Sequence, residues 1–429
     1  MGQVHFLPSH SLSLLRGPTS SPPCSADMTF EFYVPRLKGR PHQNCQKERI
    51  FGLFNWPSRI KQKEKFSKLQ TVQFVQSEEP QHSMKVPVIS PDTPDGDKHY
   101  RPPSLFPIGP HFLKYENNPI LKPNPDNEFE EAYIYNAAAI VLDDMVFLLY
   151  RAQNRARTLS VGLAWLTDGY NFRRYHKPIL YPTEPWEQGG GCEDPRIVRD
   201  PVSKKFIMTY TAYDRHLARL CVAESMDLLH WKKHPPVIRD DNWSEICNGL
   251  DGSQFIRTAW LKSGAVFVDK HWDGNYYMIW GESGFYFAKS DDLVNWRLVS
   301  SNYSLSLYTV GKFNWQDRLI EPGPAPIKIE NGNKHQNHYI LFYNSSTTGA
   351  GQYPRATYTI SQMLVDYDNL QDGPLARLEK PILVPERPNE VTGQVNQVVF
   401  TEGIVQFKGK WFLYYGQGDS ELGVATCPA

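Results

Sequence analysis

The sequence predicts an all-β protein: a five-bladed β-propeller preceded by an irregular N-terminal extension. From residue 115 onward, short runs rich in Val, Ile, Tyr and Phe alternate with Gly, Asp and Asn turns, as strands do. Two short markers recur along this part of the chain at intervals of about 60 residues, enough for one four-stranded sheet with its loops. Five such units without helical stretches fit a ring of blades better than a sandwich, which does not predict evenly spaced copies.

The first marker is a proline followed by two aliphatic residues, at 119–121, 178–180, 236–238 and 381–383. The second is an Asp turn between a small and an aromatic residue, at 164–172, 223–231 and 288–296. Between the markers lie the predicted central strands of the five blades, at 145–150, 206–213, 276–280, 339–343 and 411–415.

The chain is expected to divide near residue 110, into an extension at 1–110 and the propeller at 111–429. The extension is rich in Pro, Ser, Lys and Gln and has little periodicity; short strands are predicted at 29–34 and 50–54, and 59–68 is a basic run. From Pro87 to Pro110 prolines recur every few residues, which indicates an extended linker or a strap along a surface. No chemistry is assigned to this part.

Composition excludes several function classes. Lys and Arg number 46, as do Asp and Glu, so no charge imbalance points to nucleic acid or to an anionic membrane surface. No run approaches the roughly 18 apolar residues of a membrane span. The six cysteines lack CxxC spacing, which argues against a zinc site and a disulfide scaffold. The lack of a disulfide pattern and of a clear signal sequence favours a cytoplasmic location.

The stretch at 188–197 is the strongest candidate for a site. Three glycines allow close approach to a ligand, and the acids Glu193 and Asp194 follow. Pro195 is expected to force an extended conformation on Asp194, while Arg196 could orient one of the carboxylates. Alone, such an acidic segment is most often only a turn.

Corresponding strand ends in the other units also carry unusual residues, at 150–152, 280–282 with Lys262 upstream, 321–326 and 414–419. Loops at one end of a propeller channel converge, so these groups are expected to meet. Convergent carboxylates with flanking arginines and aromatic residues describe a glycoside site, in which one acid protonates the leaving oxygen and another activates the nucleophile.

Residues 115–427 resemble glycoside hydrolase family 130, the β-mannoside phosphorylases and related mannosidases, which are five-bladed propellers. The resemblance implies that Asp194 is the general acid, acting through a hydroxyl of the bound mannosyl unit. It also implies that Arg151 and Asp419 line the sugar site. The matching segments are 117–121, 136–140, 149–152, 193–197, 290–293, Gly393, 396–400, 414–416 and Asp419.

The sequence departs from the phosphorylases after the strand at 276–279. There this chain has Trp280-Gly281-Glu282, where the phosphorylases have a basic pair that helps to hold phosphate. Glu282 would repel phosphate, and a second acid is what a hydrolase needs to deprotonate water. Glu282 is therefore the candidate base, although a surface glutamate at a strand end is the simpler interpretation. Glu245 is a second candidate, for which a solvated loop acid is the better explanation.

The sequence thus predicts an inverting enzyme that cleaves β-linked mannosides, by hydrolysis in preference to phosphorolysis. Asp194 would be the acid and Glu282 the base, and Arg151, Glu193, Arg196, Asp419, Tyr150 and Lys262 would contact the substrate. The alternatives are a β-mannoside phosphorylase, in which Lys262 and Arg151 anchor phosphate, and an inactive carbohydrate-binding propeller. The expected partner is a mannoside oligosaccharide, and the sequence leaves open whether the protein forms a homo-oligomer. No metal or cofactor is expected, and phosphate is a co-substrate only for a phosphorylase.

Overall fold

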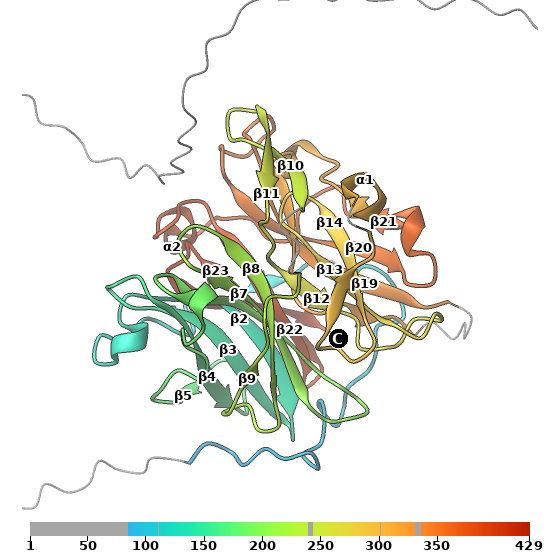
Figure 1. Cartoon of the computed structure of the whole chain (residues 1–429). Coiled ribbons are helices and arrows are strands. Elements are labelled where there is room, and N and C mark those ends of the chain that lie inside the picture. The colour runs from blue at the N-terminus through green and yellow to red at the C-terminus, as the bar shows by residue number, and fades with distance from the viewer. Residues whose placement is uncertain (1–84, 110, 239–242, 301, 331–335) are drawn as a thin grey trace, which may run out of the picture. The chain divides into compact units, whose positions relative to one another are not determined.

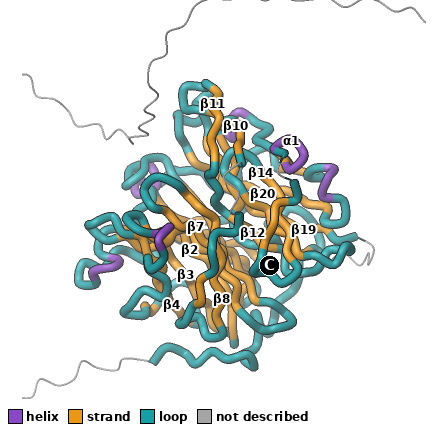
Figure 2. Tube along the Cα trace, viewed as in Figure 1, coloured by secondary structure: helices purple, strands orange, loops and turns teal. Residues whose placement is uncertain are grey.

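The computed structural model describes residues 85–109, 111–238, 243–300, 302–330 and 336–429, so the predictions for 29–34, 50–54 and 59–68 lie outside the described residues. Regular structure in this part is almost entirely β-strand (Figure 1, Figure 2). No helix in it is long and apolar enough to span a membrane. Its helices are short turns: η1 (Glu128–Glu130), η2 (Pro185–Glu187), α1 (Tyr303–Ser306), η3 (Asn314–Gln316), η4 (Leu370–Asp372) and α2 (Pro388–Val391).

The strands form five antiparallel blades, as predicted. Blade 1 contains β2 (Tyr133–Leu142), β3 (Met145–Gln153), β4 (Leu159–Leu166) and β5 (Arg173–Arg174). Blade 2 contains β6 (Gly191–Arg199), β7 (Phe206–Tyr213), β8 (Ala218–Ser225) and β9 (Lys232–Lys233). Blade 3 contains β12 (Gly264–Val266), β13 (Tyr276–Trp280), β14 (Phe285–Ser290), β15 (Trp296–Leu298) and β16 (Leu307–Thr309).

Blade 4 contains β17 (Leu319–Pro322), β18 (Ile327–Lys328), β19 (His338–Ser346), β20 (Tyr358–Asp366) and β21 (Ala376–Arg377). Blade 5 contains β22 (Val399–Phe407), β23 (Lys410–Gln417), β24 (Glu421–Pro428) and β1 (Leu113–Lys114). All five predicted central strands are confirmed, since they lie within β3, β7, β13, β19 and β23. A separate hairpin of β10 (Ser244–Asn248) and β11 (Gln254–Thr258) belongs to no blade.

The ring closes in blade 5, whose outer strand, β1, precedes blade 1 in the sequence. Leu113 and Lys114 of β1 pair with Thr426 and Ala425 of β24, so strands far apart in the chain hold the last blade together. Blades 1 and 2 are joined by a parallel bridge between Leu159 and Gly191. Gly191 has a φ of 127°, and a Cβ there would lie 2.1 Å from the Leu159 carbonyl oxygen, so this close approach requires glycine.

Both predicted markers are blade-building devices. In three of the proline markers the last residue bridges to the third strand of a blade: Leu121 to Leu422, Leu180 to Val161 and Leu383 to Ile360. The Asp turns link the third and fourth strands, and each carboxylate accepts a hydrogen bond from the backbone N–H two residues later. A fourth such turn, at Asp366, completes the set. Blade 5 has none, because its fourth strand is β1.

Three blades also share a buried cluster of an acid, a tyrosine and a cation. In each, a glutamate on the short helix before the blade accepts a hydrogen bond from a tyrosine of the central strand and pairs with a cation on the fourth strand. The clusters are Glu130, Tyr150 and Arg174 in blade 1, Glu187, Tyr210 and Lys233 in blade 2, and Glu390, Tyr415 and Lys114 in blade 5. These contacts tie the two ends of each blade to its middle.

Residues 85–109 run along the propeller, held mainly through their backbone. The Arg199 guanidinium donates hydrogen bonds to three carbonyl oxygens of residues 90–93 at 2.6–3.0 Å. The Gln362 amide exchanges two 2.9 Å hydrogen bonds with the backbone of Ile108, and Gln406 exchanges two of 2.6 Å with Arg101. This segment is a strap that contacts blades 1, 2, 4 and 5.

Candidate active site

The innermost strands bring one buried polar residue from each blade to the centre of the ring. Asn136 donates a 3.0 Å hydrogen bond to Asp194, and Ser263 donates one to Glu321. Lys262 lies 3.3 Å from Asp194 and 3.2 Å from Glu321, which connects blades 2 and 4. The five residues, all less than 5% exposed, are Asn136, Asp194, Ser263, Glu321 and Glu402.

Backbone irregularities aim three of these side chains. The pairing register shifts at Asn136 in β2, at Asp194 in β6 and at Glu402 in β22, as at a β-bulge, which redirects a side chain out of the regular alternation. Asn136 and Asp194 have φ values of 44° and 57°. The predicted extended conformation of Asp194 is therefore wrong: the bulge places it in the left-handed region, which aspartate and asparagine adopt more often than most residues.

Asp194 is held as an anion. Burial alone would raise its pKa, but Arg151 at 2.8 Å and Lys262, with the hydrogen bond from Asn136, outweigh burial and lower it below the ordinary value. Its neighbour Glu193 pairs with the other side of the Arg151 guanidinium, and burial raises the pKa of Glu193. The two adjacent acids thus share one arginine and differ in proton affinity.

Asp419, predicted to line the sugar site, follows β23 with a φ of 50°. Burial raises its pKa to about 7, and the charge of Asp194 adds to this while Arg151 opposes it. Arg151, Asp194, Glu193 and Asp419 therefore form one electrostatic cluster, in which Asp419 and Glu193 hold protons more readily than Asp194 does.

Glu282 interacts electrostatically with Lys262, as Asp194 does, and is contacted by the hairpin region. Its Oε2 accepts hydrogen bonds from Arg257 at 2.6 Å and from the indole of Trp260 at 3.0 Å. Burial would raise its pKa, but Arg257 and Lys262 lower it to about 2. Glu245, in contrast, is buried beneath Arg257 with 2.9 and 2.7 Å hydrogen bonds to that guanidinium, and burial raises its pKa. Glu245 is therefore not the solvated loop acid that the simpler interpretation expected.

Two residues predicted to contact the sugar have other partners. Tyr150 is fully buried, and its hydroxyl donates to Glu130 in the cluster of blade 1. Arg196 is 3% exposed; it donates to the carbonyl oxygens of Pro322, Gly323 and Asp194 and pairs with Glu402 at 3.3 Å. The contacts of both side chains lie within the protein, and their predicted role in sugar binding stays a prediction.

Several residues of this site were not predicted from the sequence. Asn136 falls within a segment matched to the family but was given no role. Arg257 and Trp260 carry no motif, since they reach Glu282 from outside the blades. Burial raises the pKa of Glu402 well above its ordinary value, and no local pattern around it predicted a central position. No group of His, Cys, Asp and Glu among the described residues could hold a metal ion.

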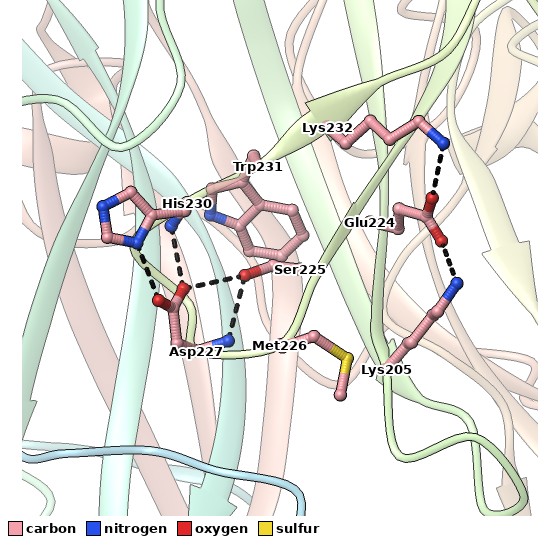
Figure 3. Close-up of a pocket in the computed structure, with 8 residues that line it drawn as sticks. All are labelled: Lys205, Glu224, Ser225, Met226, Asp227, His230, Trp231 and Lys232. Carbon is pink, nitrogen blue, oxygen red and sulfur yellow. Dashed lines mark hydrogen bonds and ion pairs between the residues drawn. The ribbon is translucent and has the colours of Figure 1, made fainter.

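A surface hollow on blade 2, with a volume of about 440 Å³, lies outside this centre (Figure 3). His230 and Asp227 at its edge resemble a catalytic pair, with Nδ1 2.7 Å from Oδ2. Asn171, Asn295 and Asn369 make the same contact to the aspartate in three other Asp turns, at 2.7, 2.7 and 2.9 Å. His230 therefore completes a structural turn.

The repeated blades and the central acids match a known family. Residues 109–429 match the sequence model of glycoside hydrolase family 130, described as beta-1,4-mannooligosaccharide phosphorylase. The chain belongs to glycoside hydrolase family 130. Membership confirms the five-bladed fold and makes this chain a carbohydrate-active enzyme of the glycosidase or glycoside phosphorylase kind.

The family 130 relatives include both kinds of activity. The chain is 30% identical over 335 residues to a beta-1,2-mannobiose phosphorylase from Thermoanaerobacter, covering 73% of this chain and 96% of the relative. It is 30% identical, with a TM-score of 0.64, to a glycosyl hydrolase from Bacteroides ovatus, covering 77% and 98% of the two chains. A further structure with the same identity, TM-score and coverage accompanies the statement that this family of mannoside phosphorylases contains glycoside hydrolases that target beta-1,2 mannosidic linkages in Candida mannan.

Proposed function

We propose that this family 130 enzyme cleaves β-linked mannosides with inversion and that water is the attacking group. The observation that carries the proposal is Glu282, a second carboxylate that, like Asp194, interacts with the charge of Lys262. An inverting hydrolase needs one acid for the leaving oxygen and one base for water. Oε2 of Glu282 accepts two hydrogen bonds, and no donor to Oε1 is found among the described residues. That oxygen is available to a water molecule.

Asp194 is the group that delivers a proton to the leaving oxygen. Because Arg151 and Lys262 keep its pKa low, it is ionised in the free protein. Asp419, whose pKa burial raises to about 7, is the group of the cluster that can hold a proton near neutral pH, and burial also raises the pKa of Glu193. Binding of the sugar, whose hydroxyls take up hydrogen bonds from the arginine and lysine, would weaken their hold on Asp194. A proton can then move to it before the glycosidic bond breaks.

Water is favoured over phosphate by the way in which charges pair in the site. Arg151 contacts Glu193 and Asp194, Lys262 contacts Asp194 and Glu321, and Arg257 binds two further glutamates. Phosphate would need to displace carboxylates from these cations, and their repulsion would oppose its binding.

Phosphorolysis is the second candidate, and the curated relatives, both named as phosphorylases, favour it. One feature of the site supports it as well. Arg318, which acts on the charge of Glu282, donates to Ser346 and Tyr358, and no carboxylate pairs with it among the described residues. It is the cation of the site best able to hold phosphate.

The test measures products released from β-1,2- and β-1,4-linked mannobiose, with and without inorganic phosphate. Hydrolysis predicts free mannose without phosphate, formed first as the α-anomer and seen by NMR. Asp194→Asn and Glu282→Gln should each lose activity by about 10²–10⁴-fold, whereas the exposed control Glu386→Gln should not. In Glu282→Ala, azide should restore turnover and form α-mannosyl azide. Mannose 1-phosphate formed only with phosphate, by wild type and Glu282→Gln alike, would replace hydrolysis with phosphorolysis.

A further inference from the structure

The hairpin of β10 and β11 stands apart from the blades and projects above them (Figure 1). Its strands pair Glu245 with Arg257 directly across the ladder, so these two side chains share one face. This face is turned toward blade 3, because Arg257 contacts Glu282 and Ser283, which follow β13. The hairpin therefore reaches the candidate site through one arginine.

Arg257 uses its whole guanidinium to connect the two acids. Its Nη1 lies 2.6 Å from Glu282 Oε2, while its Nε and Nη2 donate to one oxygen of Glu245. Nη2 also donates to the Ser283 hydroxyl at 3.1 Å. The two hydrogen bonds to Glu245 fix the orientation of the planar Arg257 guanidinium, and the guanidinium in turn orients Glu282. A lysine ammonium has no such planar set of donors.

The Trp260 ring completes this arrangement. The guanidinium carbon of Arg257 lies 5.1 Å from the ring centroid, within cation–π distance. The indole N–H donates to the same Glu282 oxygen that Arg257 contacts, at 3.0 Å. Both donors therefore hold Oε2, and the carboxylate can turn only by losing two hydrogen bonds.

We propose that Arg257 is a positioning residue for the reaction: anchored by Glu245, it holds Glu282 with Oε1 directed at the attacking water. This proposal rests on the proposed hydrolysis. It gives different roles to the two acids that the sequence singled out. Glu282 acts on water, and Glu245 acts only through Arg257. The hairpin thus belongs to the catalytic machinery although it lies outside the propeller.

Removal of Arg257 should also change the pH dependence of the reaction. The charged groups that act on Glu282 are Arg257 from the hairpin, Lys262 before β12 and Arg318 before β17, with Glu245 and Glu321 opposing them. Arg257 is the strongest of the cations. Loss of one close opposite charge raises a carboxyl pKa by roughly one to three units. From about 2, this would bring the pKa of Glu282 to roughly 3–5, so the carboxylate becomes partly protonated at the acid end of an assay from pH 4 to 8.

The experiment compares kcat/KM on β-mannobiose from pH 4 to 8 for wild type, Arg257→Lys and Arg257→Gln. The control is Arg297→Gln, which removes an exposed arginine of blade 3. We expect Arg257→Gln to lower kcat by about 10–100-fold with little change in KM. The ratio of mutant to wild-type kcat/KM cancels the titrations that both enzymes share. This ratio should fall further toward low pH. Arg257→Lys should restore the flat ratio but only part of kcat. Glu245→Gln should lower kcat less than Arg257→Gln does and leave the ratio flat, because Arg257 keeps its charge beside Glu282.

The inference fails if wild type hydrolyses mannobiose and Glu282→Gln is inactive, but Arg257→Gln, folded by its melting temperature, keeps wild-type kcat and a flat pH ratio. The proposed function fails separately, if wild type releases mannose 1-phosphate only with phosphate. If Arg257→Gln does not fold, Arg257→Lys and Glu245→Gln decide the matter, because an intact kcat in both would overturn the positioning role.

Discussion

Lys232 and Lys233 are adjacent on β9 but lie in different environments, which allows a matched test of the blade clusters. The Lys233 ammonium lies 2.6 Å from Glu187, with the lysine side chain 9% exposed and the glutamate fully buried. The Lys232 ammonium lies 3.1 Å from Glu224, with its side chain 73% exposed. Lys→Met at each position removes the charge and keeps most of the apolar part of the side chain.

The expected losses differ because only one substitution leaves a buried charge unpaired. Breaking a buried pair by removing one partner costs about 3–5 kcal/mol. Glu187 would keep hydrogen bonds from Tyr210, Thr183 and Glu184, so we expect the lower end, about 3 kcal/mol. An exposed pair contributes about 0–1 kcal/mol, so Lys232→Met should change the free energy of unfolding by less than that.

Urea unfolding followed by tryptophan fluorescence measures both free energies. In Lys233→Met/Glu187→Gln the unpaired charge is gone, so about half of the lost stability should return. Equal losses for the two single substitutions would refute the reasoning, as would a double substitution no more stable than Lys233→Met. Either result would mean that the acid, tyrosine and cation clusters do not stabilise the blades.

Two further predictions concern Asp419 and the strap. Because burial raises the pKa of Asp419 to about 7, the folded state holds a proton that the unfolded state releases above about pH 4. Stability should therefore fall as pH rises from 4 to 7, and Asp419→Asn should flatten this dependence in melting temperatures measured between pH 4 and 8. Arg199→Met removes the donor that holds the carbonyl oxygens of residues 90–93, so limited proteolysis should cut within 85–109 several-fold faster than in the exposed control Arg297→Met.

The parts of the fold that could be predicted are those that short-range patterns determine. The central strands and the Asp turns depend on neighbouring residues, so they are visible in the sequence. The closure of blade 5 by β1 was not predicted, because Lys114 and Ala425 are brought together only by the ring. Tyr150 seemed to belong to the site because it adjoins Arg151, but successive residues of a strand face opposite sides.

The candidate site was predictable where one segment carries its residues. Asp194 stands in a distinctive motif, and Glu282 stands out because it replaces an expected basic residue. The bulge that gives Asp194 a φ of 57° could not be predicted, because it depends on pairing between β6 and β7. Arg196 was expected at the sugar because it follows two acids of the site and could orient one of their carboxylates. Blade 4 instead presents the backbone carbonyl oxygens of Pro322 and Gly323 to it.

Blade 3 departs from the frame that the other blades share, and this departure distinguishes the two candidate bases. In blade 4 the cluster persists with an amide: Gln316 contacts Tyr343 and Arg377. In blade 3 the central strand has Trp280 at the position of the cluster tyrosine. The acid that precedes this blade, Glu245, binds Arg257 of the inserted hairpin. Glu245 thus corresponds to the structural acids of its sister blades, whereas Glu282 has no carboxylate counterpart at the ends of their central strands. A residue that the repeat does not require is the better candidate for chemistry, and for this reason we assign the base to Glu282 and the anchor to Glu245.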